Sequence, residues 1–253
     1  MKKTLGTWIY TTALAGALLC ATQPVVAETA GNNAVAMQAW RAIGQLEAEK
    51  GIPRGLLHSM SLVETGQGMD GSLLPWPYTI NVNGTKAYSF TKSADALAKM
   101  DALRRLGFNR FKLTVADKAM KNLNNVRVEN ELAAVADGTT ITLAALGHAK
   151  RFGSAEEGGK YVRNLIQNGY KNVDIGLMQI NWYFHGENFK SVEEAFDPAK
   201  NASYAVSYLS KHREERDWWN SVGRYHSGTS KHAQRYIRSV YAMYRRVHRI
   251  QNS

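Results

Sequence analysis

The chain has 253 residues, a formal net charge of +11 and a single cysteine, Cys20. This length allows one domain with an insertion or two small domains, and without a second cysteine the fold must depend on a hydrophobic core rather than on disulfide bonds. The excess of Lys and Arg favours an acidic polymer as partner. Nucleic acid is one such polymer, but the chain has no nucleic-acid-binding motif and begins with an export pattern, so we expect no nucleic-acid partner.

The first 27 residues have the pattern of a secretory signal peptide. Lys2 and Lys3 precede an apolar run over 5–19, and Val25-Val26-Ala27 offers the small or aliphatic residues that precede cleavage. The run is short for a spanning helix, so we expect cleavage near Ala27 and no stable membrane span afterwards. Cys20 follows a bulky Leu, which fits lipidation poorly. The mature chain would then be 28–253.

After the signal peptide the pattern is mostly helical. Apolar residues three or four positions apart, together with capping signals, predict helices over 34–50, 53–65, 94–106, 157–168, 198–211 and 232–250. Pro53 suits the first turn of the second helix, and Gly66 suits its C-terminal cap. Ser93 suits the N-terminal cap of the third. In the last helix we expect one apolar stripe and a solvated basic face, the stripe being made of Tyr236, Val240, Tyr244 and Val247.

Residues 75–173 interrupt this pattern. Asn83-Gly84 lies between alternating apolar residues at 78–82 and 88–90, which predicts a β-hairpin. Segments 111–115 and 139–143 also alternate as strands do, and we expect 107–160 to form a small structure of its own. The sequence thus predicts a mostly α (α+β) fold, a helical domain with an inserted subdomain, approximately 75–173, that contains a β-hairpin.

Glu64 is the first candidate for chemistry. It ends the helix predicted over 53–65, and its spacing from Leu57 and Met60 places it at the border of the apolar face. Burial and the negative end of the helix dipole both disfavour the ionised carboxylate and raise its pKa. A general acid that acts near neutral pH requires this. By itself, however, a Glu near a helix end is more commonly exposed.

Two further segments hold polar residues in unusual surroundings. Gln179 and Asn181 lie within the apolar run 174–182, where amides need hydrogen-bond partners. Sugar hydroxyls and N-acetyl groups could be those partners, and so could the backbone. Tyr225 lies between glycines in 221–228, where its phenol could approach a carboxylate or be buried in a loop between helices.

Together these segments resemble a known family. The strings Ser61-Leu62-Val63-Glu64-Thr65-Gly66, Gly176-Leu177-Met178-Gln179-Ile180-Asn181 and Gly223-Arg224-Tyr225-His226-Ser227-Gly228 are similar to the three signature motifs of soluble lytic transglycosylases, which share a goose-type-lysozyme-like fold. The third motif departs from the family's Ala-Tyr-Asn-Ala-Gly at three positions. The segments 76–84 and 174–176 also resemble a subgroup associated with conjugation and envelope-spanning secretion machines.

The resemblance implies an activity and a set of site residues. The activity is cleavage of the bond between N-acetylmuramic acid (MurNAc) and N-acetylglucosamine (GlcNAc) in peptidoglycan, with Glu64 as the single acid and base and a 1,6-anhydro product. No metal or cofactor is implied. The expected location is the periplasm, with a conjugation or secretion machine as a candidate partner. Tyr225 is expected to hydrogen-bond Glu64, and the implied substrate-binding residues are Gln179, Asn181, Tyr225, Met178 and His226.

Two alternatives stay open at this point. A glycosidase with two carboxylates would hydrolyse the same bond with water, and its second carboxylate could be Asp174, Glu187 or Asp197. The chain could instead be a non-catalytic, wall-binding component of a secretion or conjugation assembly, with 75–173 as its docking module.

Overall fold

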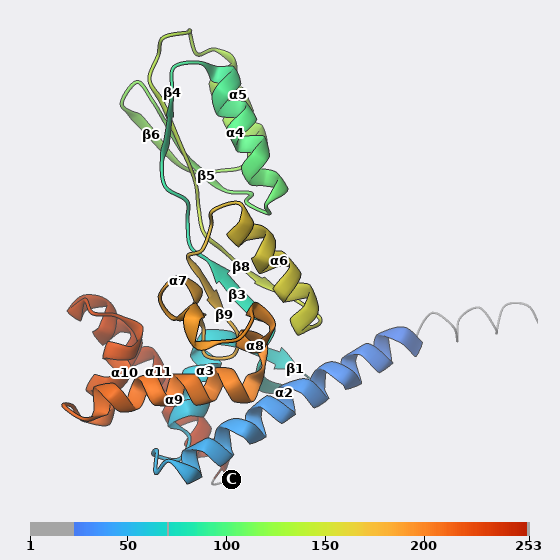
Figure 1. Cartoon of the computed structure of the whole chain (residues 1–253), viewed down its shortest axis with the longest axis vertical. Coiled ribbons are helices and arrows are strands. Elements are labelled where there is room, and N and C mark those ends of the chain that lie inside the picture. The colour runs from blue at the N-terminus through green and yellow to red at the C-terminus, as the bar shows by residue number, and fades with distance from the viewer. Residues whose placement is uncertain (1–22, 70, 252–253) are drawn as a thin grey trace, which may run out of the picture.

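The structure is a computed structural model that describes residues 23–69 and 71–251. Within these ranges a helical body carries a smaller lobe, which stands on it at the top of Figure 1. Residues 1–22, most of the predicted signal peptide, lie outside the described residues, and the predicted cleavage site after Ala27 falls in the first turns of the first described helix. The mostly helical α+β fold predicted from the sequence is confirmed.

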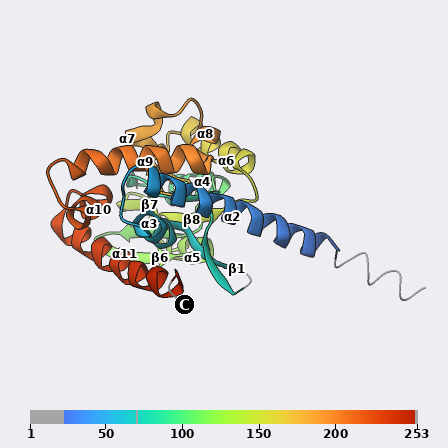
Figure 2. The same cartoon turned by 90° about the horizontal axis from the view of Figure 1, so that it is seen from below.

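All six predicted helices are present, and shorter ones join them. The helices are α2 (Gln23–Glu49), α3 (Leu56–Thr65), α4 (Ser93–Arg105), α5 (Asn125–Ala133), α6 (Ala155–Gln167), α7 (Trp182–His185), the 3-10 helix η1 (Gly186–Asn188), α8 (Val192–Phe196), α9 (Pro198–Arg213), α10 (Trp218–His226) and α11 (Ser230–Gln251). The loop expected around Tyr225 is thus helix α10. In the body, α3 lies in the middle with α2 and α11 packed against it (Figure 2).

The strands form three small antiparallel sheets. One is the hairpin of β1 (Gly66–Met69) and β2 (Ser72–Pro75). The second, in the body, has the order β10-β9-β3-β8, with β3 (Thr79–Val82), β8 (His148–Arg151), β9 (Val173–Ile175) and β10 (Ile180–Asn181). The third, in the lobe, has the order β4-β7-β5-β6, with β4 (Tyr88–Phe90), β5 (Phe111–Val115), β6 (Lys118–Leu123) and β7 (Ile141–Ala145).

The hairpin predicted around Asn83-Gly84 is wrong. β3 pairs with β8 and β9, whereas β4 pairs with β7, so the two flanking strands belong to different sheets. Here the chain passes from body to lobe, and a Cβ on Gly84 would lie 3.0 Å from the Ala145 carbonyl oxygen. The hairpin of the insertion is β5–β6. Its turn residues, Ala116 and Asp117, have φ of 44° and 69°, a conformation that residues other than glycine rarely adopt, so no Asn-Gly signal marks it.

Helix α3 begins later than predicted, because a distant carboxylate determines its start. Gly55 has φ 84° and precedes the helix, so Pro53 lies outside it. The Glu47 carboxylate of α2 accepts the main-chain N–H groups of Gly55 at 2.7 Å, Leu57 at 2.7 Å and His58 at 3.2 Å. These are the donors that a helix start leaves unpaired. Glu47 also bonds the His58 ring at 3.0 Å, and both side chains are buried.

Two other caps differ from expectation. Gly66 ends α3 with φ −57°, so it is not a left-handed cap. Glycine is needed there because a Cβ would collide with the Leu62 carbonyl oxygen. The residue before α4 is Lys92, and the Ser93 hydroxyl donates to the Val135 carbonyl instead of capping the helix. The lobe is closed by apolar side chains from its sheet and from α4 and α5, namely Met100, Leu103, Phe111, Leu113, Val128, Leu132, Ile141 and Leu143.

Candidate active site

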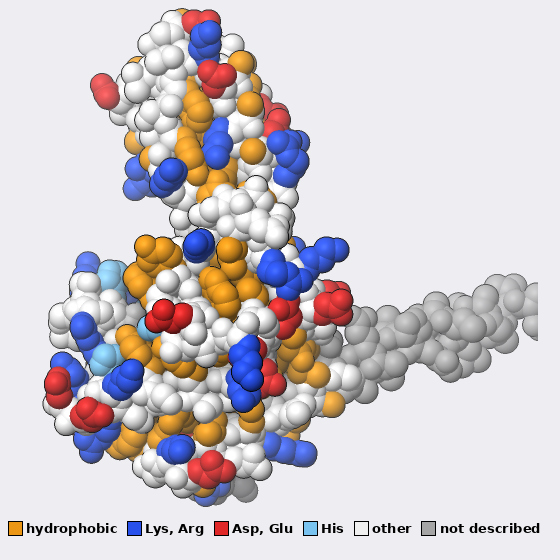
Figure 3. All heavy atoms as spheres, in the orientation of Figure 1, with side chains coloured by type: hydrophobic (Ala, Val, Ile, Leu, Met, Phe, Trp, Pro, Cys, Tyr) orange, Lys and Arg blue, Asp and Glu red, His pale blue; other side chains and the backbone are white. Residues whose placement is uncertain are grey.

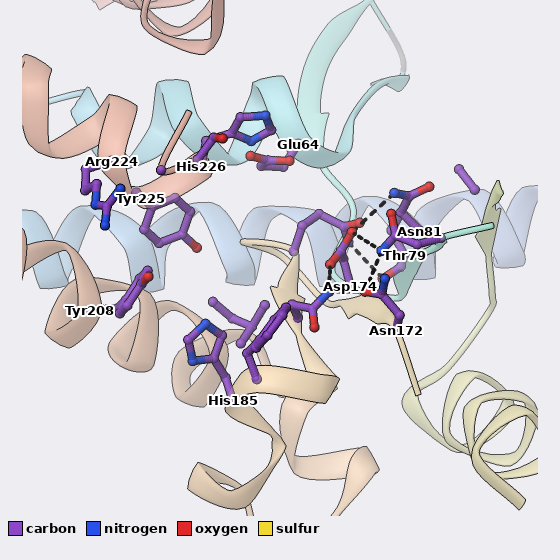
Figure 4. A pocket seen from close by; sticks show the side chains of 18 of the residues that line it. Glu64, Thr79, Asn81, Asn172, Asp174, His185, Tyr208, Arg224, Tyr225 and His226 are labelled. Carbon is purple, nitrogen blue, oxygen red and sulfur yellow. Dashed lines mark hydrogen bonds between the residues drawn. The ribbon is translucent and has the colours of Figure 1, made fainter. Parts of the chain in front are cut away.

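A cleft of about 1040 Å³ lies between the helices of the body and the sheet β10-β9-β3-β8. Figure 4 shows Glu64 and His226 on the helical side, and Asp174 among amide side chains on the sheet side. The residues that line the cleft come from α3, all four strands of this sheet, α7, α9 and α10, and they include Glu64, Asn81, Lys150, Asp174, Gln179, Asn181, Phe184, Tyr208, Tyr225 and His226.

Glu64 occupies the last turn of α3 and is partly buried at the wall of the cleft. Its pKa is raised from 4.5 to about 7: burial raises it most, the phenol of Tyr236 lowers it, and the negative charge of Asp174 raises it. The rise predicted from the sequence is confirmed, with burial as the main cause. Near neutral pH a substantial fraction of this carboxyl therefore carries a proton that it can donate.

The phenol of Tyr236, on α11, influences the pKa of Glu64, although its buried hydroxyl makes no hydrogen bond of ordinary geometry within the described residues. Its side chain is buried, and its ring stacks on the His226 ring with the planes at 4° and the centroids 4.3 Å apart. Burial and the charge of Glu64 both raise the pKa of Tyr236 well above its usual value, so the phenol stays protonated. Sequence analysis placed Tyr236 only in the apolar stripe of the last helix. The available signal was its hydroxyl, since a buried tyrosine usually needs a polar partner.

The hydrogen bond predicted between Tyr225 and Glu64 is wrong. The Tyr225 hydroxyl donates to the main-chain carbonyl of Met178 at 2.8 Å. Tyr225 nevertheless lines the same cleft, and after burial it is the charge of Glu64 that raises its pKa most. Tyr225 of the third sequence motif therefore donates its hydrogen bond to Met178 of the second motif, and not to the Glu64 carboxylate.

The Gly176–Asn181 loop is fixed from two sides. Buried Asn201 of α9 accepts the Met178 N–H at 2.7 Å and donates to the carbonyls of Ile175 at 2.9 Å and Ala195 at 2.8 Å. From α3, the Thr65 hydroxyl donates to the Leu177 carbonyl at 3.2 Å. Gly176 has φ 80°, and a Cβ there would lie 2.6 Å from the Ala195 carbonyl oxygen, so this position requires glycine. The second motif is thus held against the residue next to Glu64.

The amides of this loop have protein partners. Gln179, with φ 49°, donates its side-chain N–H₂ to the carbonyls of Thr79 at 3.1 Å and Gly176 at 2.8 Å, which leaves its carbonyl oxygen as the acceptor for a ligand. Asn181 accepts the Tyr183 N–H at 3.1 Å as the cap of α7, and its N–H₂ donates within the sheet. The Met178 side chain is only 1 % exposed and does not line the cleft. Met178 can therefore contribute to the site only through its main chain.

Asp174 lies at the centre of an amide cluster. Asn81, Asp174 and Asn181 are direct neighbours on the adjacent strands β3, β9 and β10. The Asp174 carboxylate accepts from the N–H₂ groups of Asn181 at 2.6 Å, Asn81 at 3.2 Å and Asn83 at 3.3 Å. Of the three carboxylates considered from the sequence, Asp174 alone lines the cleft with Glu64. Asp197 caps α9 through the Lys200 N–H, and Glu187 belongs to η1.

Within residues 23–69 and 71–251, no three His, Cys, Asp or Glu side chains gather where they could hold a metal ion. Over the same residues, no helix combines the length and the apolar character needed to cross a bilayer.

The mostly helical α+β fold, with a partly buried carboxyl at the wall of a polar cleft, is of the lysozyme-like type. Residues 157–247 match the family model described as Transglycosylase SLT domain. The match includes the second and third sequence motifs, while Glu64 precedes it. Such a domain implies peptidoglycan cleavage of the lytic transglycosylase type, outside the cytoplasm. Comparisons with curated proteins and with solved structures give no match.

Proposed function

We propose that this protein is an exported peptidoglycan lytic transglycosylase with Glu64 as its single acid and base. It cleaves the MurNAc-β-1,4-GlcNAc bond and leaves a 1,6-anhydroMurNAc end. The observation that carries the proposal is the environment of Glu64, a partly buried carboxyl with a pKa of about 7 in a cleft that also contains Gln179 and Tyr225. A carboxyl with this pKa can both give and take a proton near neutral pH.

The mechanism uses one carboxyl for two proton transfers, first as an acid and then as a base. Neutral Glu64 donates its proton to the glycosidic oxygen as the bond from that oxygen to MurNAc C1 breaks, and the sugar's own N-acetyl group supports the positive charge that develops at C1. The Glu64 carboxylate then takes the proton of the MurNAc C6 hydroxyl, whose oxygen bonds to C1. An internal nucleophile of this kind has an effective concentration on the order of 10⁵ M or more when well oriented. Tyr236 stabilises the carboxylate form between the two steps.

The remaining roles concern the substrate. Gln179 offers its carbonyl oxygen to a sugar N–H or hydroxyl, and Tyr225 and His226 line the cleft beside it. Asn181 acts mainly by holding Asp174, and Met178 acts through the carbonyl that binds Tyr225. We further propose that residues 1–27 are a signal peptide, that 28–253 with its insertion at approximately 75–173 acts in the periplasm, and that a secretion or conjugation machine recruits it.

Purified peptidoglycan sacculi test this proposal. Wild type should release muropeptides with 1,6-anhydroMurNAc ends, identified by mass spectrometry. Glu64→Gln should lower turnover by roughly 10²- to 10⁴-fold, the usual contribution of general acid–base catalysis. Glu49→Gln, an exposed carboxylate at the end of α2, is the matched control and should behave as wild type. Wild type that bound sacculi without cutting them would favour the non-catalytic, wall-binding function.

One observation favours a second candidate function, a hydrolytic muramidase. Asp174 shares the cleft with Glu64 and could direct a water molecule to C1. Hydrolysis would leave reducing-end MurNAc in place of the anhydro form. Products with reducing ends and no anhydro ends would therefore replace the transglycosylase proposal with this one.

A further inference from the structure

A second groove lies where the lobe joins the body, and the proposed chemistry does not involve it. Its volume is about 510 Å³, within the range of about 300–1,000 Å³ common for ligand sites. The residues that line it are 83–86, Tyr88, Lys99 of α4, 168–172 and Tyr183 of α7. The groove is therefore built largely by the insertion. In Figure 3 a constriction marks this junction, and hydrophobic side chains gather directly below it.

The groove continues the cleft. Asn83 and Asn172 line both, and their side chains are hydrogen-bonded at 3.1 Å, which forms the boundary between the two spaces. Helix α7 contributes one aromatic ring to each side, Phe184 to the cleft and Tyr183 to the groove. These rings are 66 % and 63 % exposed, among the most exposed large hydrophobic side chains of the described residues. Exposed neighbouring aromatics of this kind typically mark a binding surface.

The charged side chains that line the groove are all positive. Lys86, Lys99 and Lys171 line it, and no Asp or Glu does. Lys99 Nζ lies 4.1 Å and Lys86 Nζ 5.5 Å from the centroid of the Tyr88 ring, so both ammonium groups lie close to this one aromatic ring. None of the three lysines forms an ion pair with a residue of the described ranges. Three cations without carboxylate partners produce a positive potential that attracts an anion.

We propose that this groove, the stem groove, binds the carboxylates of the peptide stem carried by the glycan strand whose sugars occupy the cleft. The inference rests on the proposed function. The MurNAc-GlcNAc backbone is uncharged once its lactyl groups carry peptides, and the free carboxylates of the polymer then lie on those peptides. A strand in the cleft would project a stem past Asn83 and Asn172, where the lysines meet its carboxylates and Tyr183 and Tyr88 cover its apolar atoms. The insertion therefore selects peptide-bearing strands over bare glycan.

The test compares two forms of one substrate. Glycan strands with their peptides, and the same strands after an amidase has removed them, are given to wild type and to the triple variant Lys86→Ala, Lys99→Ala, Lys171→Ala. We expect the ratio of kcat/KM on peptide-bearing to peptide-free strands to fall about tenfold, mainly through KM, since exposed ion pairs contribute modestly and three are lost. The wild-type preference should also weaken at high salt. A matched control removes three lysines of the lobe's strands outside the groove, Lys112→Ala, Lys118→Ala, Lys121→Ala.

Two results would overturn the stem groove. One is an unchanged ratio, and the other is an equal loss on both substrates, which would assign the lysines to the glycan or to the fold. Failure of the proposed function is recognised separately, because wild type would then either leave reducing ends in place of anhydro ends or cut neither substrate. In that case cosedimentation of both strand types with wild type and the triple variant decides, and a preference for peptide-bearing strands that the variant loses supports the groove.

Discussion

Tyr225 donates its hydroxyl to the main-chain carbonyl of Met178 at 2.8 Å, and so links α10 to the loop that follows β9. This bond leaves the carboxyl of Glu64 to a different phenol, Tyr236 of α11. The two tyrosines therefore have separate functions that mutation can distinguish. One fixes the loop that carries Gln179, and the other adjusts the proton affinity of Glu64.

Replacing Tyr225 should affect stability more than proton affinity. Tyr225→Phe leaves the buried carbonyl of Met178 without its donor, at a cost of about 1–3 kcal/mol in the free energy of unfolding. Turnover should fall because the loop loosens, while the pH at which activity declines stays near that of wild type. Urea unfolding and a pH–rate profile measure both quantities. A shifted pH profile would contradict the assignment.

Replacing Tyr236 should affect the proton affinity of Glu64 more than the stability of the fold. The phenol of Tyr236 lowers the pKa of Glu64, so Tyr236→Phe should raise that pKa above about 7. Because the proposed acid must be protonated, kcat/KM should then decline at a higher pH than in wild type. Tyr241→Phe, on the same helix but 49 % exposed, is the control and should leave the profile unchanged. A decline at the wild-type pH in Tyr236→Phe would exclude this role.

The raised pKa of Glu64 also predicts how stability depends on pH. The folded state holds the Glu64 proton more tightly, with a pKa of about 7 against 4.5 for the free side chain. This contribution to stability is present below pH 4.5 and is lost as pH rises through about 7, amounting to about 3 kcal/mol at roughly 1.4 kcal/mol per pKa unit. The glutamine side chain of the Glu64→Gln variant does not ionise, so this variant should not lose stability from position 64 as pH rises.

Urea unfolding of both proteins from pH 4 to pH 8 measures this effect without any substrate. The free energy of unfolding of Glu64→Gln, relative to wild type, should rise by about 3 kcal/mol over that interval. Glu49→Gln serves as the control, because its carboxylate is exposed at the end of α2. Parallel pH profiles for wild type and Glu64→Gln would show that the carboxyl is not perturbed in the folded protein.

Asp174 distinguishes the two candidate mechanisms. Its charge raises the pKa of Glu64, so Asp174→Asn should lower that pKa and move the decline of kcat/KM to lower pH. With Glu64 as the only acid and base, the variant keeps some turnover and its products keep anhydro ends. Complete loss of turnover in a folded Asp174→Asn variant would favour Asp174 as a second catalytic carboxylate. Mass spectrometry of the products and a pH–rate profile give the two readouts.

Local patterns in the sequence determined the helices and the position of Glu64. Periodic apolar residues predicted all six long helices, because side chains three or four apart lie on one face whatever surrounds them. The same periodicity placed Glu64 at the edge of an apolar face, from which the direction of its pKa shift followed. The two strand segments 111–115 and 139–143 were also readable, since alternation is local as well.

Contacts between residues far apart in the chain were decided only by the tertiary structure. The Asn83-Gly84 signal predicted a hairpin, but β3 and β4 join different sheets. Asp174 meets Asn81 because β9 pairs with β3 across more than 90 residues, and Glu47 determines the start of α3 from another helix. Which tyrosine reaches Glu64 depends on how α10 and α11 pack. Burial and steric fit of the whole chain select such partners, and no local spacing specifies them.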